Sequence, residues 1–421
     1  MPAGNLFRPL KVRDFRLLWG GQTVSLLGDG IFVVALAWQT IHLSSSPAAL
    51  SAVLLARAAP EVLLAVVGGV VTDRVPRRTV LLVSDVVRTL SVGTIAVLTG
   101  TGRIEVWHLV ALGAMYGGAE AFFEPAVYSI YTEVLSPELL LEATALRSTG
   151  AILAIQLLGP ALGGVIIAAA GTVWAFGADA ISFGFSLATL MAVSARATPR
   201  REGASTGMVQ DVRDGLRYTR AQRWLWISMA LTALANFFLA GPLRVAIPVL
   251  IKETLHRGAT ALGIVTGSIG VGGLLAVIVI GRFGVGRRRA LAMYLAWVAA
   301  GISLAGAGAF HLVAAAAVFV GAAGFFLSFG NTIWLTLVQE LVPTHIMGRV
   351  FSLDTVISQG LIPVSIAAAG GMVALAGAGP TLAIGGIVSA ATTAFALTRP
   401  GALDPDRSPP PSATDRAGFV H

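Results

Sequence analysis

The chain has 421 residues, of which 56% are hydrophobic and 12% charged, against roughly a quarter charged in an ordinary soluble domain. This much apolar surface exceeds what one globular core can bury, so the composition predicts a protein that lies in a lipid bilayer. The net charge of +8 comes from arginines gathered at the ends of apolar runs, which argues against a nucleic-acid-binding face. The absence of cysteine excludes disulfides, thiolate metal sites and cysteine nucleophiles.

Apolar runs of membrane-spanning length follow one another along the chain. A membrane helix needs about 20 mostly apolar residues. The first run follows a basic segment without a small-residue cleavage site, so we expect it to be retained as a span rather than removed as a signal peptide. The runs predict an all-α polytopic protein with twelve transmembrane helices, at 16–42, 48–72, 79–99, 105–132, 140–169, 173–195, 224–251, 259–281, 289–308, 311–339, 348–375 and 379–397.

The basic residues outside these spans fall almost entirely on one side. With the N-terminus placed in the cytoplasm, the outer loops hold only Arg103, Lys252 and Arg257. Cytoplasmic loops retain positive charge, so we expect a multi-pass protein of the cytoplasmic (inner) membrane with both termini in the cytoplasm.

A polar segment divides the chain into two halves. We expect a cytoplasmic N-terminal segment over 1–15, a six-helix bundle over 16–195, a cytoplasmic linker over 196–223, a second six-helix bundle over 224–397 and a disordered tail over 398–421. Within the linker, Val209, Val212 and Leu216 recur at helical spacing among charged residues, which predicts a short amphipathic helix on the inner membrane surface. A solvated linker helix without a specific partner is the simpler interpretation.

A motif joins the second and third predicted spans, Gly68-Gly69-Val70-Val71-Thr72-Asp73-Arg74-Val75-Pro76-Arg77-Arg78-Thr79-Val80-Leu81. Gly69 permits close helix packing, and Asp73 can cap a helix N-terminus or pair with an arginine across the inner surface. An ordinary basic loop explains Arg77 and Arg78 but does not explain the Gly–Asp–Arg spacing.

This stretch resembles the signature of the major facilitator superfamily, Gly-x-Leu-Ala-Asp-Arg-x-Gly-Arg-Arg/Lys-x-x-Leu. Pro76 replaces the second glycine, and the residues in register are Gly69, Asp73, Arg74, Arg77, Arg78 and Leu81. The resemblance implies the major facilitator fold of two pseudo-symmetric six-helix bundles, in which Asp73 and its arginines help to latch the two halves in one state. The corresponding loop of the second half, from Gly281 to Arg289, lacks the aspartate, so any latch there is degenerate.

The fifth predicted span contains Gly159-Pro160-Ala161-Leu162-Gly163-Gly164. Proline removes one backbone hydrogen bond and bends a helix, while small residues let it pack tightly. The run resembles the core of a motif of exporters in the same superfamily, although Ile155 stands where that motif has an upstream glycine. A generic kinked packing helix explains the same residues. Further stretches, among them 15–19, 122–125 and 179–183, are similar to the enterobactin-exporter and macrolide-efflux branch, over nearly all of residues 7–397.

Ionisable side chains inside the spans mark the candidate transport site, because each costs a few kcal/mol at the bilayer centre unless it faces a cavity or a partner. Asp29, Glu61 and Glu120 fall near mid-depth, where a cavity role and a buried structural pair are equally open. Glu124 and Arg147 fall at similar depth on adjacent spans, which favours an ion pair with a structural or gating role. The candidates for a proton or substrate cavity are Asp29, Glu61, Glu120, Glu124, Arg147, Asp179 and Arg244, and Asp85 with Arg88 is expected to be a local helix pair near the inner surface.

Motifs for phosphate binding, zinc proteolysis and serine hydrolysis are missing, so we expect neither an enzyme nor an ATP-driven pump, and no cofactor or metal. We predict a monomeric secondary transporter that exports an amphipathic drug, macrolide or siderophore by alternating access, with the proton gradient as its driving force. Its partners would be the small-molecule substrate, protons and membrane lipid. The fourth span lacks the central arginine of many proton antiporters, so proton coupling is inferred from the acidic residues. The alternatives are an importer or facilitator of a small organic solute or lysophospholipid, and a non-transporting membrane sensor or assembly protein.

Overall fold

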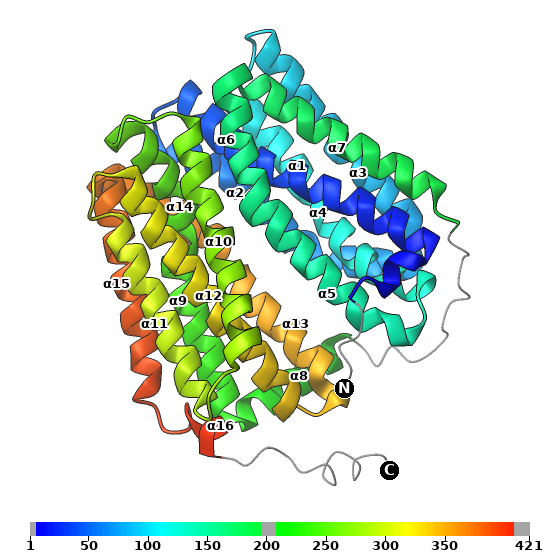
Figure 1. Cartoon of the computed structure of the whole chain (residues 1–421), viewed down its shortest axis with the longest axis vertical. Helices are drawn as coiled ribbons and strands as arrows, with labels where there is room; N and C mark the ends of the chain where they lie inside the picture. The colour runs from blue at the N-terminus through cyan, green and yellow to red at the C-terminus, as the bar shows by residue number, and fades with distance from the viewer. Residues whose placement is uncertain (1–5, 195–207, 408–421) are drawn as a thin grey trace.

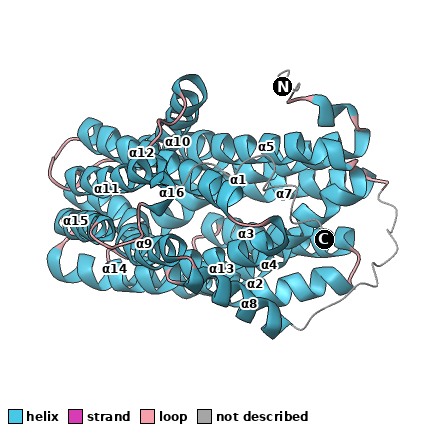
Figure 2. Ribbon diagram, turned by 90° about the horizontal axis from the view of Figure 1, so that it is seen from below, coloured by secondary structure: helices cyan, strands magenta, loops and turns pink. Residues whose placement is uncertain are grey.

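The computed structural model describes residues 6–194 and 208–407. Within these ranges the chain forms helices and loops and no strand (Figure 2). The helices run side by side in two bundles, which lie close together at one end and diverge toward the other (Figure 1). The diverging end holds the short helices α8 (Met208–Ala221) and α16 (Asp404–Arg407), and we call it the termini side.

The first bundle contains six membrane-length segments preceded by a short helix, η1 (Arg8–Lys11). Their bounds agree with the predicted spans to within a few residues, except that the sixth ends at Ala192 because Val193 is extended. The fifth segment is continuous but changes from α to π geometry and back. The segments are α1 (Arg13–Leu43), α2 (Pro47–Arg74), α3 (Arg77–Gly100), α4 (Val106–Val134), then η2 (Pro137–Leu139) with α5 (Leu140–Ala151), η3 (Ile152–Leu158) and α6 (Gly159–Ala170), and α7 (Thr172–Ala192).

The second bundle repeats this order, and its fifth segment is broken at Leu361, next to a proline. Pro363 lies in the first turn of α14, where a missing backbone N–H is best tolerated, whereas Pro160 follows the π-helical stretch of the continuous fifth segment. The segments are α9 (Arg223–Val249) continued by η4 (Leu250–Thr254), α10 (Ala259–Phe283), α11 (Arg289–Ala307), α12 (Val313–Leu341), α13 (Thr344–Gly360) followed by α14 (Ile362–Ala376), and α15 (Ala378–Leu397).

Eleven segments of the described chain are long and apolar enough to cross a membrane. The twelfth is α4, which is 29 residues long and packs against both α2 and α3. Three glutamates and His108 interrupt the apolar run of α4. With α4 included, the predicted twelve spans are all present as helices.

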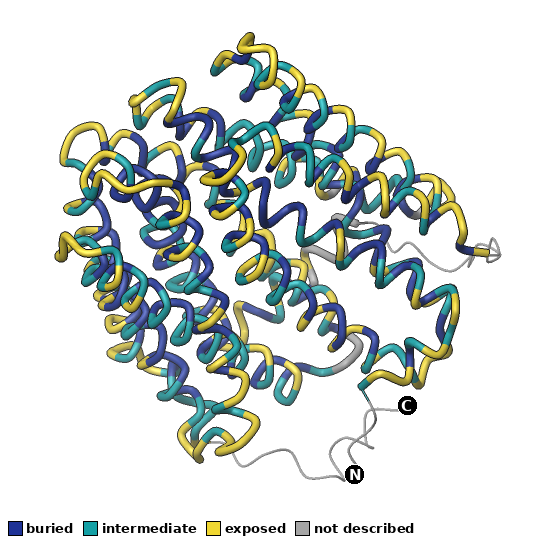
Figure 3. Tube along the Cα trace, turned by 45° about the horizontal axis from the view of Figure 1, so that its top comes forward, coloured by how far each residue is buried: buried dark blue, intermediate teal, exposed yellow. Residues whose placement is uncertain are grey.

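Buried residues lie on the helix faces that meet their neighbours, while exposed residues lie on the outer faces and in loops (Figure 3). Large apolar side chains such as Leu63, Ile181 and Leu375 are among those exposed, and Leu375 is 91% exposed. In a soluble protein so many exposed apolar side chains would be a liability, whereas here they form the surface that meets lipid.

The linker contains the predicted helix, α8 (Met208–Ala221), while residues 195–207 and the side chains of Val209 and Val212 lie outside the described part. This helix packs on α13, and a Cβ placed at Gly215 would lie 3.2 Å from the Cβ of Arg349. The interpretation of a linker helix without a specific partner is therefore wrong.

The predicted disorder from residue 398 is also wrong for the residues up to 407. Ala402 is buried, and the chain ends its described part in α16 (Asp404–Arg407). The two carboxylate oxygens of Asp406 accept hydrogen bonds from the backbone N–H groups of Ala290 and Leu291, at 2.8 and 3.0 Å. These N–H groups belong to the first turn of α11 and have no partner within that helix, so Asp406 caps it. Residues 408–421 lie outside the described part.

Candidate transport site

The charged side chains of the first bundle gather where α2 crosses α4. A Cβ at Gly117 of α4 would lie 1.8 Å from the carbonyl oxygen of Arg57, so a glycine is needed for the two helices to approach this closely. One guanidinium nitrogen of Arg57 donates to Glu120 Oε2 at 2.8 Å, and its Cζ lies 5.2 Å from the centre of the Tyr116 ring. The side chains of Arg57 and Glu120 are 22% and 18% exposed, so this ion pair is largely withdrawn from solvent.

Asp29 of α1 lies next to this pair and is held by a neutral donor. The hydroxyl of the buried Tyr116 donates to Asp29 Oδ1, and the Tyr116 ring stacks on Phe32 with centroids 4.7 Å apart. Asp29 is 6% exposed and forms no ion pair with a described residue, although Arg57 and Arg88 act on it at longer range. The structure therefore places a carboxyl group without a direct counter-charge deep in the first bundle.

Asp179 of α7 is a second carboxyl group of this kind. A Cβ at Gly28 would lie 2.3 Å from Asp179 Oδ1, so α1 and α7 pack closely beside Asp29. Ser182 makes a long hydrogen bond of 3.4 Å to Oδ1, and the buried Oδ2 has no hydrogen-bond partner in the described structure. Isolated charge is costly in such surroundings, so Asp29 and Asp179 form an acidic pair whose charge is poorly compensated.

Glu61 of α2 and Arg244 of α9 belong to different bundles and lie close enough to act electrostatically on one another. Glu61 makes no hydrogen bond or ion pair with a described residue, and the guanidinium of Arg244 donates only to the carbonyl of Ala240 at 3.3 Å. Each acts electrostatically on the other, and Arg57 acts on both. The predicted Glu61 and Arg244 are thus an acidic and a basic side chain that interact electrostatically across the bundle boundary. They form no hydrogen bond or ion pair with one another in the described structure.

The predicted pairing of Glu124 with Arg147 is confirmed. One guanidinium nitrogen of Arg147 lies 2.8 and 2.9 Å from the two carboxylate oxygens of Glu124, and the other donates to Tyr128 at 2.7 Å. The Glu124 side chain is 45% exposed, whereas Arg147 is nearly buried. The pair joins α5 to α4.

The predicted local pairing of Asp85 with Arg88 is also present, and both side chains are buried. Asp85 accepts from Arg88 and, at 2.7 Å, from Ser186 of α7. The Arg88 guanidinium lies over the rings of Phe123 and Phe183, 3.9 and 4.5 Å from their centres. With its charge compensated and its faces covered, this group holds α3, α4 and α7 together.

Near the end of α2, in the motif that joins it to α3, the glycine that allows close packing is Gly68 rather than the predicted Gly69. A Cβ at Gly68 would lie 2.3 Å from the carbonyl oxygen of Ala121 on α4, whereas a Cβ at Gly69 would meet nothing within 4 Å. Successive helix residues point about 100° apart, so only one of the two can face α4.

The arginines of this loop bind to their own bundle. Arg77 forms an ion pair with Glu133 at the end of α4, and Arg78 donates to the carbonyls of Leu190 and Met191 at the end of α7, at 3.0 and 2.6 Å. Arg74 is exposed, and the side chain of Asp73 lies outside the described part. The latch role of the loop therefore stays a prediction.

The glycines of the fifth segment face two different helices. A Cβ at Gly159 would lie 2.6 Å from the Cα of Gly30, and one at Gly163 would lie 3.2 Å from the Cα of Ile31, both on α1. A Cβ at Gly164 would lie 3.0 Å from the Cα of Gly263 on α10. The run around Pro160 therefore packs α6 between its own bundle and the other one.

Two buried or partly buried polar residues of the spans were missed from the sequence. Asp354 of α13 accepts hydrogen bonds from Trp334 Nε1 and Ser358 Oγ, both at 3.3 Å, and it could have been found because it is ionisable and lies in a predicted span. Tyr116 carries no charge, so nothing in the pattern distinguished it. Among the described residues, no cluster of histidine, aspartate and glutamate could hold a metal ion.

Two helical bundles that span a membrane and meet around charged side chains define the class of the secondary transporters of the major facilitator type. The chain belongs to the transmembrane secretion effector family, whose model matches residues 5–403, and it is therefore a transporter.

Named relatives extend over most of the chain. An uncharacterized MFS-type transporter, YfiS of Bacillus subtilis, is 28% identical over 82% of this chain and 83% of its own length. The multidrug efflux pump Tap of Mycolicibacterium fortuitum is 24% identical over 83% of this chain and 87% of its own. Macrolide efflux protein A of Streptococcus pyogenes is 22% identical over 84% and 87%.

Solved structures share the fold. A bacterial homologue of the iron transporter ferroportin in an inward-facing state has a TM-score of 0.68 at 16% identity, covering 92% of this chain and 99% of that one. The nucleoside transporter NupG has a TM-score of 0.64 at 12% identity, covering 92% and 98%. At these identities the likeness concerns the fold alone.

Proposed function

We propose that this transporter exports an amphipathic small molecule across the cytoplasmic membrane in exchange for protons. The observation that carries the proposal is that Glu61 and Arg244 act electrostatically on one another across the bundle boundary and form no ion pair in the described structure. They lie in a cluster where carboxyl groups outnumber guanidinium groups, with Asp29, Glu61, Glu120 and Asp179 against Arg57, Arg88 and Arg244.

Protonation of Glu61 would change the attraction between the bundles. Two unit charges about 4 Å apart attract by about 1 kcal/mol in water and about 4 kcal/mol in a medium of intermediate polarity. A charged Glu61 draws Arg244 toward α2, and a proton on Glu61 removes that pull. The proton therefore biases the equilibrium between the two access states, which is what coupling requires.

We further propose that the structure is the inward-open state and that the termini side is cytoplasmic. The bundles diverge toward this side (Figure 1), where the basic loops also lie. The described hydrogen bonds between the bundles lie at the opposite end. There, Ser51 Oγ donates to the Ile366 carbonyl and Lys252 Nζ to the Ile41 carbonyl, both at 2.6 Å. The inward-facing ferroportin homologue supports the same assignment.

The relatives named as multidrug and macrolide efflux proteins support export of drug-like or macrolide solutes. The Gly159–Gly164 run resembles the exporter motif, which favours export. Its position between the two bundles is consistent with a role in transport. Because a nucleoside transporter is among the solved structures with this fold, nucleosides are included among the compounds to be tested.

Inside-out vesicles that contain the full chain provide the test. Vesicles are supplied with macrolides, cationic dyes, catechol siderophores and nucleosides, with and without an inward-acidic proton gradient. We expect gradient-driven accumulation of at least one amphipathic compound, and loss of that accumulation in Glu61→Gln. Glu138→Gln, which changes an exposed carboxylate at the start of η2, is the matched control. Accumulation without a gradient would contradict proton exchange, and uptake in right-side-out vesicles alone would indicate an importer.

A further inference from the structure

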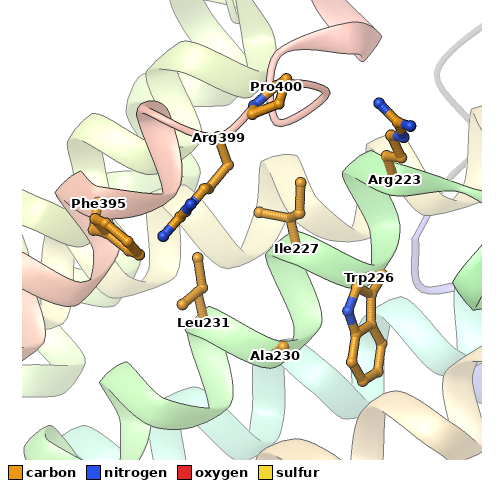
Figure 4. Close-up of a pocket in the computed structure, with 8 residues that line it drawn as sticks. All are labelled: Arg223, Trp226, Ile227, Ala230, Leu231, Phe395, Arg399 and Pro400. Atoms are coloured by element: carbon orange, nitrogen blue, oxygen red, sulfur yellow. The ribbon is translucent and has the colours of Figure 1, made fainter.

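A recess lies on the outer surface of the second bundle at the termini side, between the first and the last helix of that bundle. Its volume is about 420 Å³, and it is lined by residues of α9 and by the end of α15 with the residues that follow it (Figure 4). The recess is separate from the charge cluster described above, because its lining residues belong to the second bundle alone.

The rim of the recess is positively charged, although the carboxylate of Asp404 lies near one of its arginines, Arg223. Arg223 and Arg399 stand on opposite sides of it, with Ile227 of α9 between them (Figure 4). Neither guanidinium forms an ion pair with a described residue, and Arg399 instead lies over the ring of Phe395, 3.9 Å from its centre. A third arginine, Arg220, lies 5.9 Å from the centre of the Trp226 ring. An anion is therefore the complementary ligand for the rim.

The floor of the recess is apolar and continues onto the surface that meets lipid. It is formed by Ile227 and Leu231 of α9 and by Phe395 of α15. Phe395 is 47% exposed and the neighbouring Trp226 is 39% exposed, so both reach the outer surface. Tryptophan and arginine at the end of a membrane helix lie at the level of the lipid headgroups, with the apolar surface extending below them.

We propose that this recess binds an anionic phospholipid. Its phosphate would lie between Arg223 and Arg399, and an acyl chain would cover Ile227, Leu231 and Phe395. A free phosphate would satisfy the rim but leave the floor uncovered, whereas an uncharged or zwitterionic lipid would leave the arginines without a full counter-charge. Basic recesses between membrane helices are suited to such lipids. The inference depends on the protein lying in a membrane and does not depend on the transported solute or on proton coupling.

Trp226 allows binding to be measured directly, because bromine on a lipid chain quenches a nearby tryptophan. The full chain is placed in phosphatidylcholine nanodiscs that contain increasing fractions of brominated phosphatidylglycerol or brominated phosphatidylcholine. The part of the signal that disappears in Trp226→Phe reports the recess. We expect the phosphatidylglycerol to quench this part at a several-fold lower mole fraction, since each arginine at the surface contributes about fivefold in affinity.

The variants Arg223→Gln with Arg399→Gln should remove this preference, and Arg399→Gln alone should reduce it if the double variant does not fold. Arg282→Gln is the matched control, because Arg282 is an exposed arginine in the last turn of α10 and does not line the recess. Equal quenching by the two brominated lipids would overturn the proposal, as would a preference that survives in Arg399→Gln and in the double variant. Loss of the preference on adding millimolar glycerol phosphate would show a phosphate site rather than a lipid site, and would overturn it as well.

Discussion

Gly164 of α6 and Gly263 of α10 belong to different bundles, and a Cβ on either would lie 3.0 Å from the Cα of the other. A Cβ on Gly263 would also lie 2.5 Å from the carbonyl oxygen of Pro160. The two backbones thus touch where the run around Pro160 meets the second bundle. This contact lies away from the termini side, so it belongs to the state in which the bundles are closed at that end.

We predict that Gly164→Val weakens this state. The added side chain has no room unless α6 and α10 separate, and overpacking of this kind costs about 1–3 kcal/mol. Introduced spin labels should show the ends of α6 and α10 moving apart, with a lower melting temperature. Gly177→Val is the control, because a Cβ at Gly177 meets nothing within 4 Å. Unchanged label distances in Gly164→Val would contradict the assignment of this contact.

Glu61 and Arg244 should be energetically coupled although they do not touch. We predict that Glu61→Gln and Arg244→Gln each alter solute transport, and that the double variant differs from the sum of the single effects by about 0.5–3 kcal/mol. The measurement is a double-mutant cycle on the rate of transport at fixed gradient. Strict additivity would show that the two side chains act independently, which would remove the support for coupling through this pair.

Glu120 should matter more for stability than Glu61 does. Glu120→Gln leaves the guanidinium of Arg57 without its charged partner inside the bundle, and breaking a buried pair costs up to about 3–5 kcal/mol, less here because both side chains are partly exposed. Glu61 has no direct partner to lose. Thermal unfolding in detergent should therefore give a clearly lower melting temperature for Glu120→Gln than for Glu61→Gln. The reverse order would contradict the described pairing.

Asp179→Asn should leave the fold intact or stabilise it. The buried Oδ2 of Asp179 has no partner, and the amide has nearly the same shape without the charge. We expect an unchanged or higher melting temperature, and a smaller number of protons moved per solute if Asp179 carries one. The number of protons per solute is measured from the solute gradient that a known proton gradient supports. A strongly lowered melting temperature would show that the charge itself holds α7 in place.

The spans were predictable because each is a long apolar run, and the twelve helices begin and end within a few residues of those runs. The pairing of Glu124 with Arg147 was predictable for a related reason, since depth in the membrane can be counted from the ends of the spans. Depth does not give the rotation of a helix or the point where two helices cross. The pairing of Arg57 with Glu120 depends on the crossing at Gly117, and the choice of Gly68 over Gly69 depends on rotation, so neither followed from the pattern.

The prediction of disorder after the last span was based on composition, and it was wrong for the residues up to 407. A polar segment with proline and without apolar periodicity predicts disorder. Residues 399–407 are ordered because α11 presents uncapped N–H groups to Asp406, and that relation links residues 115 or more positions apart. Local sequence carries no signal for it.

The position of Asp406 has a practical consequence for anyone who produces this protein. A purification tag or fluorescent protein can be joined after residue 407 without touching the cap, whereas trimming the chain back to the end of α15 would expose the first turn of α11. Shortened versions chosen for crystallisation should therefore retain everything through Arg407.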